Sequence, residues 1–125
     1  MENEKKYNLE ERLIEFSLVI LKIVELLPGT PAGRHFAKQL LRSGTAPAFQ
    51  YAEAQSAESR KDFIHKLKIG LKELRETQVC LKIILRNPLT ESIELIETAI
   101  KENDELISIF VTSIATARSN LEKRK

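Results

Sequence analysis

Residues Leu41–Glu76, LRSGTAPAFQYAEAQSAESRKDFIHKLKIGLKELRE, hold the densest polar pattern of the chain, a predicted bend and a strongly basic helix. Gly44 and Pro47 interrupt the first half, because a proline inside a helix removes a backbone hydrogen bond at a cost of about 3 kcal/mol. We expect a kink or a tightened turn there rather than a break in the chain. Ser59, followed three residues later by Asp62, predicts the start of the next helix. The stretch therefore predicts two helices.

Two further helices are predicted outside this stretch, from apolar residues that recur at spacings of three and four. Asn8 is expected to cap the first helix, Thr30 the second and Thr90 the fourth. Short connections make neighbouring helices antiparallel. The chain is therefore predicted to be all-α, a single domain over residues 1–125 that forms an antiparallel up-down-up-down four-helix bundle. The expected helices span about residues 8–27, 31–56, 59–86 and 90–121.

The first predicted helix has more apolar surface than one bundle core can cover. Its core seam alternates spacings of four and three: Leu9, Leu13, Phe16, Ile20, Ile23 and Leu27. Five more apolar residues widen the apolar arc beyond one face: Leu18, Val19, Leu21, Val24 and Leu26. Either this helix is deeply embedded, or its second face meets another subunit. The fourth helix has the most regular seam, in which Asn103 is expected to fix the register.

Composition and charge narrow the function classes. The 125 residues are 42% hydrophobic and 30% charged, which suits one domain with a real core. Cys80 is the single cysteine, so a disulfide within the chain is excluded and a reducing cytoplasm is favoured. The longest mostly apolar run, Phe16–Leu27, contains Lys22 and Glu25 and is too short to cross a bilayer.

The net charge of +2 is unevenly distributed. Residues 32–86 hold eleven basic and five acidic side chains, whereas residues 87–117 hold one and six. Such asymmetry is typical of a face that binds polyanions, or of two protein surfaces that attract each other.

One face of the third predicted helix is basic. The members of this basic stripe follow the three-four spacing of the core seam on the opposite side, with Val79 as the single gap: Lys61, His65, Lys68, Lys72, Arg75, Lys82 and Arg86. At 1.5 Å per residue the stripe is about 38 Å long. One interpretation is a solvated face with ordinary i,i+4 pairs, such as Lys72 with Glu76. The other is a surface for a polyanion, because a solvated face usually mixes both signs along its centre.

A polar network is predicted between the second and third helices. Arg42 and Glu53 are eleven residues apart, about three helical turns, and lie on one side of the helix if the bend at Pro47 is small. Glu73 and Glu76 add charges near the middle of the third helix. These four residues form either a binding site or structural ion pairs, and we favour ion pairs because charges packed among small residues need partners. On this interpretation Glu53→Ala destabilises the fold.

Catalytic chemistry is poorly represented. A di-iron bundle needs about four carboxylates and two inward-facing Glu-x-x-His pairs, but the chain offers a single Asp62-x-x-His65 pattern. His65 lies opposite the seam and His35 follows Arg34, so both are expected at the surface. No Gly-rich phosphate loop and no Ser-His-Asp or Cys-His set can be assembled, and Cys80 is expected to be a small core residue. We expect no enzyme activity, no metal and no cofactor.

Motif residues in the middle of the chain carry a resemblance to a known family. They are an RSGT motif at residues 42–45, then Ala52, Glu53 and Ala54, then Ser59, Asp62 and Phe63, and finally Leu71, Lys72, Glu73, Arg75, Glu76 and Thr77. In this pattern the chain resembles the small four-helix-bundle proteins encoded within intervening sequences of bacterial 23S rRNA genes. The match runs from the first helix to about Asn120. Pro47, Phe49, Gln50 and Tyr51 depart from the family pattern.

The resemblance implies a left-handed bundle that assembles as a pentamer and has no established catalytic activity. It also implies a distant similarity to the nucleic-acid-binding accessory proteins of diversity-generating retroelements. Together with the charge pattern, this predicts a non-enzymatic homo-oligomer whose basic stripe binds RNA or DNA. The alternative is a self-assembling scaffold or protein-interaction module, in which the stripe of one subunit meets the acidic fourth helix of the next. No small-molecule substrate and no membrane partner are indicated.

Overall fold

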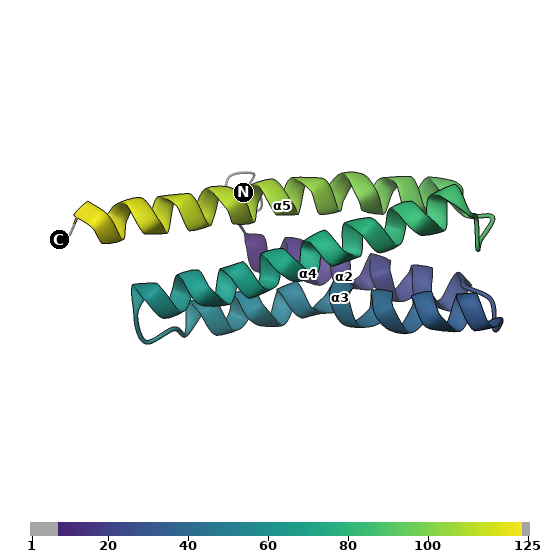
Figure 1. Ribbon diagram of the computed structural model, residues 1–125, viewed down its shortest axis with the longest axis horizontal. Coiled ribbons are helices and arrows are strands. Elements are labelled where there is room, and N and C mark those ends of the chain that lie inside the picture. Colours follow the sequence, from purple (N-terminus) through teal and green to yellow (C-terminus); the bar gives the residue numbers. More distant parts are fainter. Residues whose placement is uncertain (1–7, 124–125) are drawn as a thin grey trace.

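Four helices make up most of the computed structural model, which describes residues 8–123. In chain order they are α2 (Leu9–Leu26), α3 (Pro31–Gln55), α4 (Arg60–Arg86) and α5 (Ile93–Lys123). No strand occurs within residues 8–123. Successive helices run in opposite directions along one long axis (Figure 1), which confirms the all-α four-helix bundle expected from the sequence.

Side-chain caps begin three of the helices. Backbone N–H groups of the first turn donate to Asn8 Oδ1 at 3.0 Å, to Thr30 Oγ1 at 3.1 Å and to Ser59 Oγ at 3.0 Å. The fourth helix starts later than the sequence suggested, at Ile93. The hydroxyl of Thr90 accepts the N–H of Ser92 at 3.2 Å, so Thr90 organises the connection before α5 and does not cap the helix itself.

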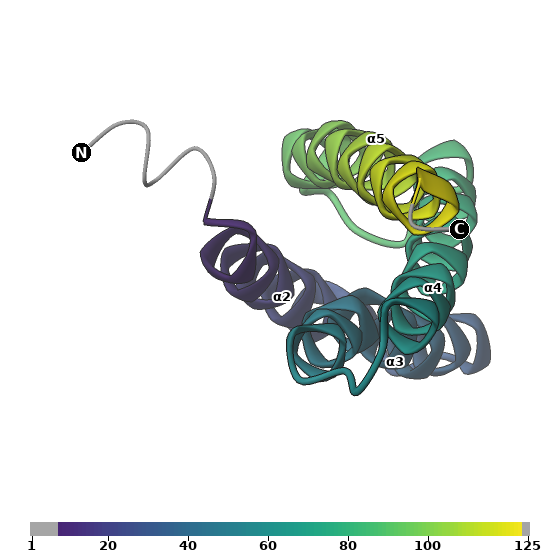
Figure 2. The same ribbon diagram turned by 90° about the vertical axis from the view of Figure 1, so that its left-hand side faces the viewer.

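The helices follow one another around an arc. α3 packs against α2 on one side and α4 on the other, and α4 packs in turn against α5, whereas α2 and α5 have few contacts. Seen along the bundle, α2 and α5 form the two ends of the arc (Figure 2). Arg12 joins these ends, because its Nη2 donates to Glu102 Oε1 at 2.7 Å and its Nε to Oε2 at 3.1 Å. A bidentate ion pair therefore fixes the first turns of α2 to α5.

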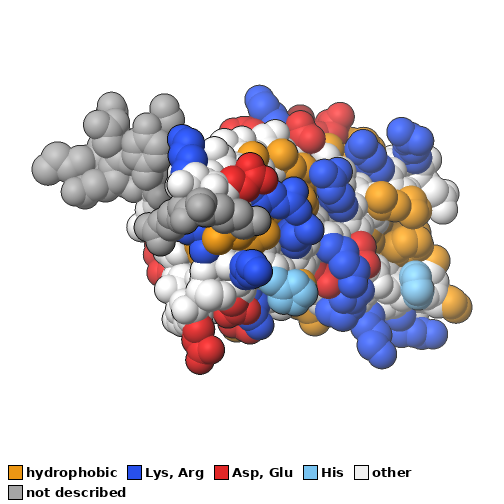
Figure 3. Space-filling model, turned by 60° about the vertical axis from the view of Figure 1, so that its left-hand side comes forward, with side chains coloured by type: hydrophobic (Ala, Val, Ile, Leu, Met, Phe, Trp, Pro, Cys, Tyr) orange, Lys and Arg blue, Asp and Glu red, His pale blue; other side chains and the backbone are white. Residues whose placement is uncertain are grey.

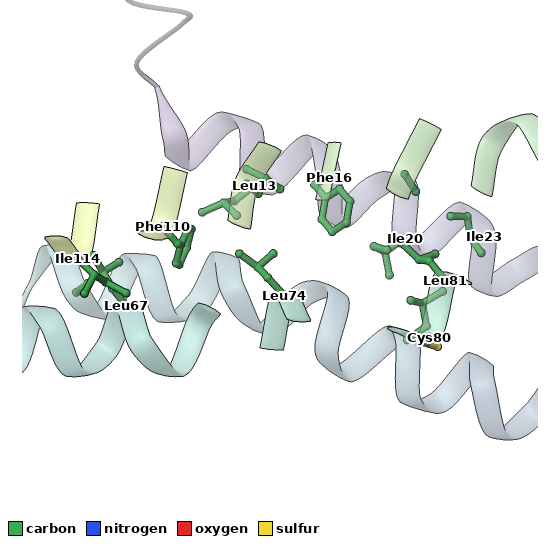
Figure 4. Packing of buried hydrophobic residues seen from close by; sticks show 14 of the residues in the cluster. Leu13, Phe16, Ile20, Ile23, Leu67, Leu74, Cys80, Leu81, Phe110 and Ile114 are labelled. Atoms are coloured by element: carbon green, nitrogen blue, oxygen red, sulfur yellow. The ribbon is translucent and has the colours of Figure 1, made fainter. Parts of the chain in front are cut away.

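The predicted seams supply most of the core. In α2 the seam residues Leu13, Phe16, Ile20 and Ile23 are at most 2% exposed. The buried side chains form one row along the bundle, and Leu67 of α4 and Ile114 of α5 mark one end of it (Figure 4). The core thus extends past the start of α2.

Asn103 is a polar member of the core. It is fully buried, and its Nδ2 donates to the carbonyl of Leu74 at 2.8 Å and to Gln78 Oε1 at 3.0 Å. Both partners lie on α4. A one-turn slip of α5 against α4 would break both bonds, so this contact accounts for the expected role of Asn103 in fixing the register.

Two glycines allow helices to approach closely. A Cβ atom on Gly70 would lie 2.7 Å from Cε2 of Phe110 on α5, and one on Gly44 would lie 2.8 Å from side-chain carbons of Ile20 on α2. Carbon atoms prefer separations of about 3.5–4.0 Å, so neither position has room for a side chain. α3 stays helical from Pro31 to Gln55, and the buried Pro47 does not break it.

Candidate nucleic-acid interface

The basic stripe lies on the outer face of α4. Its seven members are all exposed: Lys61, His65, Lys68, Lys72, Arg75, Lys82 and Arg86. Val79, the gap in the stripe, is 59% exposed, so the face is open to solvent along its length. The opposite side of α4 carries the buried seam of Ile64, Leu67, Leu74 and Leu81. The periodicity of α4 therefore separates an apolar core face from a cationic outer face.

The cations of the stripe have no acidic partners within residues 8–123. The ion pairs of this part of the chain join Arg12, Arg42 and Lys66 to carboxylates, and none involves a stripe residue. The i,i+4 pair expected between Lys72 and Glu76 does not form, because the Glu76 carboxylate lies 3.3 Å from Nη2 of Arg42. The positive charge of the stripe is consequently left uncompensated by its own helix.

The α3 helix extends the basic surface. Arg34, Lys38 and Arg42 are exposed on this helix, which packs against α4. Arg34 and Lys38 were missed in the sequence analysis, although their i,i+4 spacing places them on one helix face. Figure 3 shows Lys and Arg side chains covering much of one face of the molecule, with fewer acidic side chains among them. We call the stripe together with Arg34, Lys38 and Arg42 the basic face.

The predicted polar network is only partly assembled. Arg42 Nη1 lies 3.2 Å from Glu73 Oε2, and Arg42 Nη2 lies 3.3 Å from Glu76 Oε2. Glu53 is not a member, because its carboxylate accepts from Lys66 Nζ at 3.0 Å. The packing of α3 against α4 decides these partners, and linear spacing along α3 does not contain that information.

Glu73 is the buried carboxylate of this network. Its side chain is 9% exposed, whereas that of Arg42 is 57% exposed. Desolvation by burial raises the pKa of Glu73 above its ordinary value, the neighbouring Glu76 raises it further, and Arg42 opposes both effects. Burial outweighs the ion pair because water screens the half-exposed guanidinium. The ionised form of Glu73 is therefore held at a net cost.

Two buried hydroxyls continue the α3–α4 contact inward. Thr77 Oγ1 donates to Ser43 Oγ at 3.0 Å and is also 2.9 Å from the carbonyl of Glu73. Both Ser43 and Thr77 have no exposed surface. Ser43 of the RSGT motif and Thr77 of α4 thus take part in packing two helices.

The cysteine and the two histidines of residues 8–123 lie in different surroundings. Burial raises the pKa of the Cys80 thiol to about 11, so the nucleophilic thiolate is scarce at neutral pH. His35 and His65 are exposed, on α3 and α4 respectively. Within residues 8–123 no group of three or more His, Cys, Asp or Glu side chains is placed to hold a metal ion. None of the four described helices is apolar and long enough to cross a membrane.

Comparisons with known proteins give the same fold and a family. The sequence model described as 23S rRNA-intervening sequence protein matches residues 5–112. A crystal structure from Bacteroides thetaiotaomicron, of a protein with unknown function in the S23 ribosomal protein family, is similar with a TM-score of 0.77 and 31% sequence identity. The similarity covers 84% of this chain and 96% of that chain. No curated protein matches the sequence.

Proposed function

Because the chain belongs to the family of 23S rRNA-intervening sequence proteins, we propose that it is a non-enzymatic, cytoplasmic homo-oligomer that binds RNA or DNA through its basic face. The observation that carries this proposal is the unpaired charge of the stripe. Its six Lys and Arg side chains are exposed, and none forms an ion pair within residues 8–123. A pentamer is the oligomer that the family resemblance implies.

A row of unpaired cations favours a polyanion for a physical reason. Nucleic acids carry a condensed layer of counterions, and a protein cation that neutralises a phosphate releases one of them. Six cations on one straight helix lie along about 38 Å, a length over which double-stranded DNA presents many phosphates. Lys and Arg contacts of this kind bind the backbone and carry little sequence information. We therefore expect binding with weak sequence preference.

Exposed apolar side chains on α2 support the oligomer. Ile14, Leu18 and Leu21 are 40%, 53% and 41% exposed, and they lie opposite the buried seam. Exposed apolar side chains that share one helix face favour a contact with another protein surface. Light scattering at micromolar concentration should give several times the 14.3 kDa chain mass.

The double variant Lys68→Glu/Lys72→Glu tests the proposal. We expect it to lose binding to RNA and DNA at low salt while keeping the subunit mass of the wild type, because both side chains point outward. A matched control, Lys101→Glu/Lys123→Glu, makes the same change in net charge on α5, away from the basic face, and should retain most of the binding.

The same variant separates the proposal from the scaffold alternative. If the stripe meets the acidic α5 of a neighbouring subunit, through residues such as Glu94, Glu97 and Glu105, the reversal breaks the assembly. Two results together would support the scaffold and overturn the proposal: the double variant dissociates, and the wild type binds no nucleic acid at low salt.

A further inference from the structure

The first helix is too short to cover the whole bundle. α2 has 18 residues and α5 has 31, so at 1.5 Å per residue they are about 27 Å and 46 Å long. Among the helices of residues 8–123, α3, α4 and α5 continue past the start of α2 (Figure 1). A groove with a volume of about 660 Å³ opens at this place and is bounded at one end by Leu9 and Arg12. It is lined by α3, α4 and α5 beyond the first turn of α2.

The groove has an apolar floor and a polar rim. Tyr51, Phe63, Leu67 and Ile109 contribute apolar surface, and α5 adds an edge with Asp104, Ser108, Thr112 and Ser113. Tyr51 is half-buried in this floor. The Arg12 end is held in place by the bidentate ion pair with Glu102. An apolar floor flanked by polar groups is the form of groove that binds one face of an amphipathic helix.

The chain itself carries an unpartnered apolar helix face of matching size. Ile14, Leu18 and Leu21 follow a four-three spacing on α2, and we call them the outer stripe of α2. The stripe spans about 10 Å along its helix, and the groove edge from residue 104 to residue 113 spans about 14 Å. Lys22 follows the stripe directly, and Asp104 lies at the Arg12 end of the groove. Within residues 8–123 neither forms an ion pair.

We propose that the outer stripe of α2 in one copy docks into the groove of a second copy, with Lys22 of the first facing Asp104 of the second. This inference rests on the proposed homo-oligomer and identifies its interface. Docking would cover two apolar surfaces that each copy exposes, and it would place a helix of one copy beside α3, α4 and α5 of the other. Because the stripe and the groove are different surfaces, the contact is head-to-tail, and successive copies generate a ring or a filament.

A mixing experiment tests this arrangement. Leu18→Arg damages the outer stripe of α2, and Thr112→Arg damages the groove. Both positions are exposed, so circular dichroism should show wild-type helicity for each variant. Each variant alone should fall to the 14.3 kDa mass of one chain in light scattering. An equimolar mixture should give a dimer, because the intact groove of Leu18→Arg can still bind the intact outer stripe of Thr112→Arg. Val79→Arg, at an exposed position on α4, is the matched control and should leave the mass unchanged.

The outcomes distinguish this interface from the oligomer itself. A wild type that is monomeric would overturn both proposals. A wild-type oligomer whose mass survives Leu18→Arg and Thr112→Arg would overturn the interface alone. A mixture that stays monomeric would also overturn it, because the intact groove of one variant would then fail to bind the intact outer stripe of the other. A symmetric contact between two outer stripes would instead leave Thr112→Arg oligomeric on its own. The reversal Asp104→Lys should weaken assembly, and Lys22→Asp added to it should restore assembly.

Discussion

Gly70 of α4 lies against the Phe110 ring of α5. Replacing it by alanine would improve the intrinsic helix propensity by about 1 kcal/mol, but the new methyl group would lie 2.7 Å from the Phe110 ring. Overpacking of a core typically costs about 1–3 kcal/mol. We therefore expect Gly70→Ala to lower the free energy of unfolding, as measured by urea denaturation.

Gly29 provides the control for this substitution. It lies in the α2–α3 connection, and a Cβ atom there would have no atom within 4 Å. Gly29→Ala should leave stability unchanged or raise it by up to about 1 kcal/mol, through a less flexible unfolded chain. A Gly70→Ala protein that is more stable than the wild type would show that propensity, and not packing, governs this site.

Glu73 should make stability depend on pH in an unusual direction for a carboxylate. Its pKa is raised in the folded protein by burial, above the ordinary value of 4.5. Below pH 4.5 the Glu73 carboxyl is protonated in both the folded and the unfolded protein. As the pH rises toward the folded pKa, the unfolded protein ionises more readily than the folded protein. The contribution of Glu73 to the free energy of unfolding is therefore lost as the pH rises through the folded pKa. In Glu73→Gln the stability relative to the wild type should therefore increase between pH 4 and pH 7.

Urea denaturation of both proteins across that range measures this difference, and the titration of other carboxylates cancels between them. If the stability of Glu73→Gln relative to the wild type instead declined with pH, the ion pair with Arg42 would outweigh burial.

Glu53 shows what sequence spacing could not predict. Arg42 and Glu53 are on one helix, but Glu53 pairs with Lys66 and its side chain is 51% exposed. Exposed ion pairs contribute at most about 1 kcal/mol, so Glu53→Ala should shift the unfolding midpoint little. This differs from the destabilisation expected when Glu53 is counted in the network with Arg42. A large decrease in stability would instead indicate that Glu53 belongs to the network with Arg42.

At the scale of the helices, the α3–α4 contact depends on a buried hydroxyl pair. Thr77→Val would leave Ser43, which has no exposed surface, without its partner. Stranding a buried polar group costs about 1–3 kcal/mol. The double variant Ser43→Ala/Thr77→Val should recover part of this stability, and a double-mutant cycle of denaturation free energies measures the coupling. Additive effects of the two substitutions would indicate that the two hydroxyls do not interact.

The helices themselves were largely predictable. Apolar periodicity located the buried seams, and the capping residues Asn8, Thr30 and Ser59 mark the starts of α2, α3 and α4. The start of α5 was misplaced at Thr90, because the Thr90 side chain satisfies a loop N–H instead of a helical one. Local sequence patterns therefore predict the existence of a helix more reliably than they predict its N-cap residue.

At the scale of the whole molecule, the exposure of the basic stripe on α4 followed from periodicity alone. In an amphipathic helix, the charged face opposite the buried seam points away from the core. Two features needed the arrangement of the helices in space. Arg34 and Lys38 join the basic face because α3 packs beside α4, and the groove is lined jointly by α3, α4 and α5 beyond the first turn of α2. Neither relation is visible in a single helix.

The central claim is that the basic face contacts phosphates, and the salt dependence of binding tests it most directly. Wild-type affinity for RNA or DNA should fall with salt, by a log–log slope of about −0.7 to −0.9 for each phosphate neutralised. Removing two cations by Lys68→Gln/Lys72→Gln should make that slope shallower by about this amount for each phosphate that the variant no longer neutralises. A wild type that does not bind at low salt, or a slope that is the same in wild type and variant, would contradict the claim.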